Sequence, residues 1–109
     1  MNVQWSERAA EEFVATILYV VNKFGQFAAQ KLRTRINDSI NKISQFPEIG
    51  TITFTDDETG IEFHELQCGL NSVVYTIYNG EIYIVSIWSN RQNRDKLYSA
   101  LKADAKDKS

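Results

Sequence analysis

The chain has 109 residues, of which 43% are hydrophobic and 24% are charged, and its formal net charge is −2. A chain of this length can bury one hydrophobic core, so we expect a single domain over residues 1–109. The acidic balance argues against a protein whose main task is to grip RNA or DNA, because phosphate contacts require a surplus of Lys and Arg.

The first half of the chain has the pattern of a short strand followed by two helices. Val3–Trp5 is the predicted strand, and Ser6 is a suitable N-cap for a helix over about Glu7–Lys23. Gly25 ends that helix, and a second helix is predicted over about Gln26–Gln45. Each helix has one apolar stripe with three- and four-residue spacing. The short link between the two stripes predicts an antiparallel helical hairpin.

The second half alternates between apolar and polar positions, as strands do. Four strands are predicted, over Thr51–Thr55, Ile61–Gln67, Val73–Tyr78 and Glu81–Trp88. Asn79 and Gly80 join the last two, because both residues tolerate the positive φ angles of a tight hairpin turn. A final helix is predicted over about Arg91–Lys102, with Leu97 and Leu101 on its apolar side, and the tail from about residue 103 is expected to be frayed.

This order of elements predicts an α+β domain. We expect the N-terminal strand, an antiparallel helical hairpin packed on one face of a mostly antiparallel sheet of about four strands, and a short C-terminal helix. The single cysteine, Cys68, cannot form an internal disulfide and is expected to be inert. The most apolar stretch, Phe13–Val21, is far shorter than the ~20 residues of a membrane span. We therefore expect a cytoplasmic protein with no membrane association, and no motif suggests a metal or another cofactor.

Several short motifs follow one another over most of the chain: Val3-Gln4-Trp5-Ser6, Phe46-Pro47-Glu48-Ile49-Gly50, His64-Glu65-Leu66, Val74-Tyr75 and Ser89-Asn90-Arg91. In this order they resemble the RelE/ParE superfamily of bacterial toxins (the plasmid stabilisation protein family), which are the toxins of type II toxin–antitoxin systems. Two positions depart from the family's pattern. His64 stands where the family usually has Arg, and Ser89 stands where it usually has His.

The resemblance implies a toxin, and the charge distribution favours its ParE-like branch. Family members that cleave messenger RNA are generally basic and use Lys and Arg on the central sheet, whereas this chain has no Lys or Arg between Ile43 and Asn90. The ParE-like branch implies a toxin that inhibits a protein target, DNA gyrase, by binding it and that a cognate antitoxin neutralises. Direct RNA binding is not favoured, and DNA would be contacted only through the antitoxin complex. One alternative is a RelE-like, ribosome-dependent mRNA endonuclease. Another is a degenerate, non-toxic member that binds an antitoxin or represses its operon.

Two arginines and two tyrosines are the candidate contacts to a target or partner. Arg91 and Arg94 are three residues apart, so on a helix they would share a face and could bind a phosphate or an acidic surface. Tyr78 and Tyr83 could pack against a partner. If the chain were a nuclease, Arg91 and Arg94 would stabilise charge and His64, the only histidine, would move a proton.

For the remaining candidates we expect structural roles. His64 is expected on a half-exposed face of its strand, and Glu62 and Glu65 are expected to be solvated strand charges that point to opposite faces. Tyr75 and Trp88 are expected in the core. The acidic loop over residues 56–58 is expected to be a solvated turn.

Overall fold

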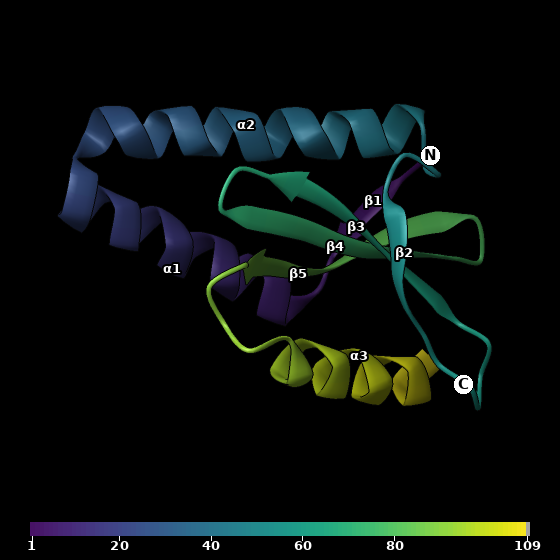
Figure 1. Cartoon of the computed structure of the whole chain (residues 1–109). Helices are drawn as coiled ribbons and strands as arrows, with labels where there is room; N and C mark the ends of the chain where they lie inside the picture. The colour runs from purple at the N-terminus through teal and green to yellow at the C-terminus, as the bar shows by residue number, and fades with distance from the viewer. Residues whose placement is uncertain (109) are drawn as a thin grey trace.

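A five-stranded sheet lies between a helical hairpin and a single C-terminal helix (Figure 1). The structure is a computed structural model that describes residues 1–108. In chain order the elements are β1 (Val3–Trp5), α1 (Glu7–Phe24), α2 (Gln26–Gln45), β2 (Thr51–Thr55), β3 (Glu62–Cys68), β4 (Asn71–Tyr78), β5 (Glu81–Ser89) and α3 (Arg94–Lys108). The α+β class is therefore confirmed.

The strands lie in the order β1-β5-β4-β3-β2. Strands β2 to β5 form an antiparallel meander, and β1 joins its edge by pairing in parallel with β5, where Val3 lies opposite Ile82. The sheet thus has five strands rather than about four, because the N-terminal strand adds to the meander. Asn79 and Gly80 have positive φ angles of 51° and 75°, as the predicted hairpin turn between β4 and β5 requires.

The helical hairpin forms with nearly the predicted boundaries. The Ser6 hydroxyl oxygen accepts a hydrogen bond of 3.0 Å from the amide of Ala9 and so caps α1. Gly25 ends α1 with a φ angle of 90°, and its amide donates to the carbonyl oxygen of Val21. A Cβ at Gly25 would meet no atom within 4 Å, so its backbone conformation, and not a shortage of space, is what favours glycine at this turn.

Both faces of the sheet are packed. The hairpin face buries one cluster, which comprises Ala9, Ile36, Ile40, Ile43, Cys68, Val73, Tyr75, Ile82, Ile84 and Ile87. On the α3 face a second cluster comprises Phe63, Val74, Val85, Trp88, Leu97, Leu101 and Ala105. The expected core positions of Tyr75 and Trp88 are confirmed, since they are 0% and 5% exposed. Strands β4 and β5 are buried from both sides, and the fold is a three-layer arrangement in which α3 covers part of the second face.

Helix α3 differs from the sequence prediction at both ends. It begins at Arg94 rather than at Arg91, because the side chain of Asn93 accepts a hydrogen bond of 3.0 Å from the amide of Asp95 and so stabilises the first turn. It continues to Lys108, past the predicted end near Lys102, because Ala105 is buried one turn beyond Leu101. Within residues 1–108 no helix is both long enough and apolar enough to cross a membrane.

The burial of α3 can be tested at Leu101, whose side chain is fully buried. We expect Leu101→Ala to lower the free energy of unfolding by about 2–4 kcal/mol, because the substitution leaves a cavity under the helix. The exposed neighbour Lys102 is the matched control, and Lys102→Ala should change stability by less than about 0.5 kcal/mol. Urea denaturation would measure both values, and equal effects would contradict the packed position of α3.

Candidate functional site

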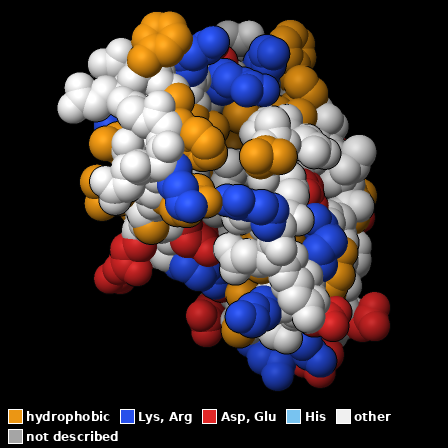
Figure 2. Space-filling view, turned by 60° about the vertical axis from the view of Figure 1, so that its left-hand side comes forward, with side chains coloured by type: hydrophobic (Ala, Val, Ile, Leu, Met, Phe, Trp, Pro, Cys, Tyr) orange, Lys and Arg blue, Asp and Glu red, His pale blue; other side chains and the backbone are white. Residues whose placement is uncertain are grey.

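Positive charge and exposed apolar side chains gather at one end of the molecule. Residues 13–37, which span most of the helical hairpin, contain four Lys or Arg residues and no Asp or Glu. In the upper part of Figure 2, Lys and Arg side chains lie among hydrophobic ones with little acidic surface beside them, whereas in the lower half of that view Lys and Arg lie together with most of the acidic side chains. The net charge of −2 therefore hides an uneven distribution.

Arg91 lies at this end and packs on the ring of Tyr19. Its guanidinium carbon is 5.3 Å from the ring centroid, and its Nη1 donates a hydrogen bond of 3.5 Å to the Tyr19 hydroxyl. This hydrogen bond and the positive charge of Arg91 lower the pKa of Tyr19. Because β5 ends at Ser89, the loop that follows it brings Arg91 against α1.

A pocket of about 250 Å³ lies beside Arg91, and we call it the Arg91 pocket. Its lining comes from α1, from the β3–β4 turn and from the end of β5, and comprises Ala15, Thr16, Tyr19, Val20, Phe24, Leu70, Asn71, Ser89 and Arg91. Phe24 and Leu70 are 68% and 70% exposed, so the rim of the pocket presents apolar surface to solvent. An apolar pocket with one guanidinium at its edge suits an apolar side chain that has an acidic neighbour.

Apolar surface continues along the outer side of α1. Val14 and Leu18 lie one turn apart and are each 57% exposed. With Ala10, Glu11 and Ala15 they line an open hollow of about 420 Å³. A helix face of this kind is a typical docking surface for a partner segment.

Arg94 occupies a different place from Arg91 and is held by an internal network. Its guanidinium pairs with the Glu65 carboxylate through Nη1 and Nη2, and Nη2 also donates a hydrogen bond of 3.1 Å to the Thr53 hydroxyl. Its Nε donates a hydrogen bond of 3.1 Å to the Tyr98 hydroxyl. Burial alone would raise the pKa of Glu65, but hydrogen bonds from Arg94, Ser72 and Thr53 outweigh it and lower that pKa. The hydrogen bond to Glu65 likewise raises the pKa of Arg94.

Two expectations about these charges are therefore wrong. Arg91 and Arg94 do not share a helix face, because α3 begins only at Arg94 and Arg91 lies in the preceding loop. Glu65 is not a solvated strand charge, since its side chain is only 13% exposed and pairs with Arg94. Its neighbour on the same strand, Glu62, is exposed as expected.

His64 is buried and not half-exposed as expected. It is 5% exposed and stacks on Tyr75, with ring centroids 5.1 Å apart. Its Nδ1 is 3.2 Å from the carbonyl oxygen of Gly50, a distance at which a protonated Nδ1 donates a hydrogen bond. The Tyr75 hydroxyl donates to the carbonyl oxygen of Pro47 at 2.7 Å and accepts from the amide of Gly50 at 2.9 Å. His64 and Tyr75 thus fix the segment that follows α2, and burial raises the pKa of Tyr75.

The three residues predicted for a nuclease do not form one centre. His64 stacks on Tyr75 of the hairpin-face cluster, whereas its neighbour Glu65 binds Arg94 of α3 on the other face. Adjacent residues of a strand point to opposite faces, so the sheet itself separates His64 from Arg94. Arg91 lies in a third environment, against α1.

Tyr78 and Tyr83 contact the end of α3. The Tyr78 hydroxyl donates a hydrogen bond of 2.7 Å to the carbonyl oxygen of Lys108, and the Lys108 ammonium nitrogen lies 4.0 Å from the Tyr83 ring centroid. The Tyr83 hydroxyl donates to the Glu81 carboxylate at 3.1 Å, which raises the pKa of Tyr83. Both rings are half-buried at the end of β4 and the start of β5, so they lie at the opposite end of these strands from Ser89 and Arg91.

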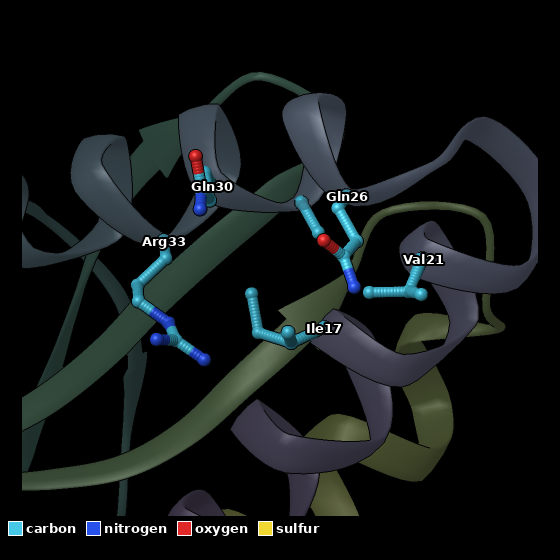
Figure 3. Close-up of a pocket in the computed structure, with 6 residues that line it drawn as sticks. Ile17, Val21, Gln26, Gln30 and Arg33 are labelled. Carbon is cyan, nitrogen blue, oxygen red and sulfur yellow. The ribbon is translucent and has the colours of Figure 1, made fainter.

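A groove runs between the two helices of the hairpin (Figure 3). It has a volume of about 260 Å³ and is lined by Ile17, Val21, Gln26, Ala29, Gln30 and Arg33. Figure 3 shows that Arg33 extends from α2 toward the space beside Ile17 of α1. The groove therefore has an apolar floor and a cation at one side.

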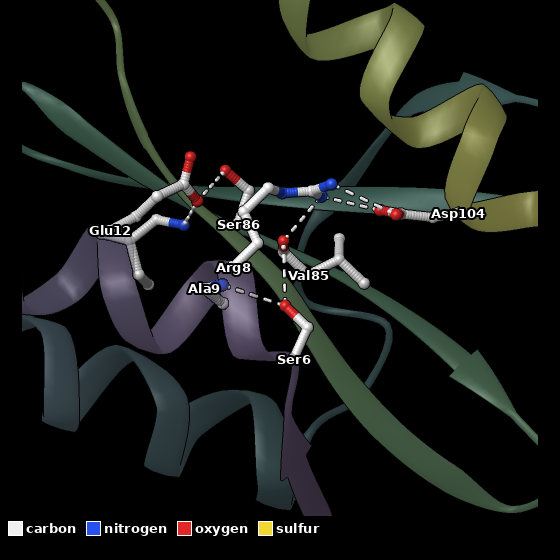
Figure 4. Close-up of polar contacts among 8 residues, drawn as sticks. Ser6, Arg8, Ala9, Glu12, Val85, Ser86 and Asp104 are labelled. Atoms are coloured by element: carbon white, nitrogen blue, oxygen red, sulfur yellow. Dashed lines mark hydrogen bonds and ion pairs between the residues drawn. The ribbon is translucent and has the colours of Figure 1, made fainter.

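Sequence reasoning missed a polar cluster that joins α1, β5 and α3 (Figure 4). Arg8 donates a hydrogen bond of 2.7 Å to the carbonyl oxygen of Val85 and forms an ion pair with Asp104 of α3. The Glu12 carboxylate accepts from the Ser86 hydroxyl at 2.8 Å and from the amide of Ile87 at 3.2 Å. Burial raises the pKa of Glu12 despite these hydrogen bonds. The only signal of this cluster in the sequence is that Arg8 and Glu12 are polar positions of α1. That signal does not indicate the partners of these two residues, which lie 74 to 96 residues away along the chain.

The acidic loop is only partly solvated. Asp57 and Glu58 are exposed as expected, but Asp56 is 2% exposed. Its carboxylate accepts hydrogen bonds from the amide and the hydroxyl of Thr59, at 2.9 and 2.8 Å, and these lower its pKa. Asp56 thus closes its own turn. Across residues 1–108, no group of three or more His, Cys, Asp or Glu side chains could hold a metal ion.

Comparisons with known proteins identify the relatives of this chain. Residues 3–94 match the model of the family described as the ParE toxin of the type II toxin–antitoxin system parDE. A solved structure described as the chromosomal ParDE TA system from P. aeruginosa is similar to this chain, with a TM-score of 0.63 and 20% sequence identity. The match covers 82% of this chain and 95% of the other, and at this identity it shows a shared fold. No curated protein matches the chain.

The pairing of Glu65 with Arg94 predicts a pH-dependent stability. Above the ordinary carboxyl pKa of about 4.3 we expect Glu65→Gln to lower the free energy of unfolding by about 1–2 kcal/mol, a modest effect because Arg94 stays partly exposed. Because the folded-state pKa of Glu65 is lowered, its contribution is lost as the pH falls through that pKa, and the gap to the wild type should narrow in acid.

Denaturant unfolding at several pH values would measure this gap. Glu62→Gln, a change of the same kind at an exposed position of β3, is the matched control and should show no gap beyond about 0.5 kcal/mol. A Glu65→Gln gap that stays constant from neutral pH into acid would contradict the assigned ion pair.

Proposed function

This chain belongs to the ParE toxin family of type II toxin–antitoxin systems, and from that premise we propose that it inhibits DNA gyrase by binding it and is neutralised by its cognate antitoxin. The observation that supports this proposal best is the apolar Arg91 pocket. It lies at the end of the molecule where residues 13–37 of the helical hairpin contain no Asp or Glu that could neutralise Arg91. A surface of this composition suits protein binding, in which a few apolar and Arg anchors dominate the affinity.

Arg91 is the residue that we assign to the target contact. Its guanidinium is exposed and has no ion-pair partner within residues 1–108. The other candidate contacts, Arg94, Tyr78 and Tyr83, are engaged with Glu65, Lys108 and Glu81 inside the fold. A target would have to displace these internal contacts before it could use them.

We assign the antitoxin to the outer side of α1. Val14 and Leu18 present an apolar strip there, next to a hollow that an apolar side chain could fill. Antitoxin segments that fold on binding gain affinity by burying such surface. Since Ala15 lines both this hollow and the Arg91 pocket, an antitoxin segment on α1 would also obstruct the target contact.

The separation of the candidate catalytic residues supports inhibition by binding over mRNA cleavage. Arg94 pairs with Glu65 of β3, and this carboxylate neutralises its charge. A phosphate would have to compete with that carboxylate, which costs free energy because Glu65 would be left half-buried without its partner. His64 lies on the other face of the sheet and could not act on the same phosphate.

A gyrase supercoiling assay with the purified protein tests the proposed target. We expect the wild type to inhibit supercoiling, and Arg91→Ala to raise the concentration for half-inhibition about tenfold, the effect of losing one charged anchor. Lys96→Ala removes an exposed cation from α3 and should inhibit like the wild type. Supercoiling that persists at a large molar excess of folded wild-type protein would rule out gyrase as the target.

Controlled induction in a bacterial host tests the toxin and its neutralisation. We expect the wild type to arrest growth without producing new 5′ ends in transcripts, and co-expression of the neighbouring antitoxin gene to restore growth. Leu18→Asp should still arrest growth, but the antitoxin should no longer restore it because it loses its apolar contact. New 5′ ends in messenger RNA that is bound to ribosomes would favour the ribosome-dependent endonuclease. Unimpaired growth with folded, soluble protein would favour a non-toxic binding module.

A further inference from the structure

The tip of the helical hairpin carries exposed cations that make no ion pair with any acidic group of residues 1–108. Four of them, which are exposed and form no ion pair within residues 1–108, are Lys23, Lys31, Arg33 and Arg35. The neighbouring segment over residues 66–80 has no charged side chain. Arg35 lies against Gly69 of that segment, so positive charge reaches the β3–β4 turn.

Exposed aromatic rings lie among these cations. Phe27 is 75% exposed, and the ammonium nitrogen of Lys31 lies 5.5 Å from its ring centroid. Phe24 is 68% exposed at the end of α1, and Lys23 lies 5.9 Å from the ring centroid of Tyr19. Leaving apolar rings exposed to solvent costs free energy, so exposed rings often mark a binding surface. Two of these rings, Tyr19 and Phe27, each have a lysine within cation–π distance.

The α2 side of the tip arranges these groups along one line. Phe27, Lys31 and Arg35 are four residues apart, so they share a helix face with a rise of about 6 Å from each to the next. With Gln30 and Thr34 they line an open hollow of about 360 Å³. Arg33 extends to the other side, over the groove between the helices (Figure 3).

We propose that this tip, defined by Phe27, Lys31, Arg33 and Arg35, binds single-stranded nucleic acid. Cations that track a phosphate backbone, with rings on which unpaired bases stack, are the elements of sequence-tolerant single-strand binding. A duplex would satisfy the cations but hide its base faces from Phe27. An acidic peptide would also pair with the cations. It lacks, however, the flat ring that each nucleotide carries beside its phosphate and that could stack on Phe27. The binding goes beyond inhibition of gyrase and does not depend on it.

Fluorescence anisotropy with a labelled oligothymidylate about 12 nucleotides long tests this proposal. We expect a Kd of about 1–100 µM at low salt and a slope of log K against log salt near −3, which corresponds to four neutralised phosphates. Lys31→Glu/Arg33→Glu should weaken binding by more than about tenfold and roughly halve that slope. Lys96→Glu/Lys102→Glu makes the same charge change at exposed positions of α3. Because salt screens charges that lie far from the contact, this control should bind the oligonucleotide within about twofold of the wild type.

The ring contribution has its own matched pair. Phe27→Ala should weaken binding about tenfold, whereas Phe46→Ala removes a ring that is 63% exposed at the far end of α2 and should have no effect. Circular dichroism on all variants would establish that they are folded. Oligodeoxyuridylate and oligouridylate of equal length, which differ only in the sugar, would show whether the sugar matters, and tighter binding of either strand supports the proposal.

Three results would overturn it. One is the absence of oligothymidylate binding by the folded wild type at low salt. A second is duplex DNA or a poly-glutamate peptide binding as tightly as the single strand, since the rings would then contribute nothing. The third is an equal loss of binding in the α2 and α3 double variants. None of these measurements contains gyrase, so their outcome is independent of the supercoiling assay.

Discussion

The β-bulge at Val85 is the constraint on which the three layers depend. The register passes from Val74 opposite Ser86 to Tyr75 opposite Ile84, so Val85 has no partner on β4. Ile84 and Ile87 pack under the helical hairpin, whereas Val85 and Trp88 pack under α3. Because side chains alternate with a period of two, an unbulged strand would send Ile87 and Trp88 to the wrong faces.

Charges from α1 hold that bulge in place. The carbonyl oxygen of Val85 accepts hydrogen bonds from Arg8 and from the Ser6 hydroxyl, and Glu12 accepts from the amide of Ile87. Arg8 also pairs with Asp104, so the same side chain fixes α1, β5 and α3 to one another. The end of β5, and with it the position of Arg91 against Tyr19, therefore depends on an interaction near the start of α1. Burial raises the pKa of Glu12, and the hydrogen bonds that its carboxylate accepts from Ser86 and from the amide of Ile87 act in the opposite direction.

The elements could be predicted from sequence because their signals are local. The period of the apolar stripes, the Ser6 cap, Gly25 and Asn79-Gly80 each act within a few residues of themselves, and α2 formed over the predicted residues. The site could be predicted only in part. The resemblance and the chemistry of its guanidinium predicted Arg91 as a contact residue, and the structure places it beside a pocket on the surface. The burial of His64 and the pairing of Glu65 with Arg94 depend on strand faces and on α3, neither of which a local pattern specifies. The same limit explains α3, whose last turn has a weak apolar pattern and is stabilised by packing on the sheet.

The net charge of a chain is a weak guide to what one end of its surface can bind, for a physical reason. Interactions in salt water fall off over about 8–10 Å, so a partner responds to the charges near its contact and not to the sum over the molecule. The principal axes of the chain measure 43, 29 and 21 Å, and its acidic residues avoid both the hairpin tip and the turn beside it. The total of −2 that argued against direct contact with nucleic acid is thus an average over ends that do not act together. Conversely, Arg94 pairs with Glu65 of β3 and is neutralised by it, so this arginine adds no free positive charge to that face of the sheet.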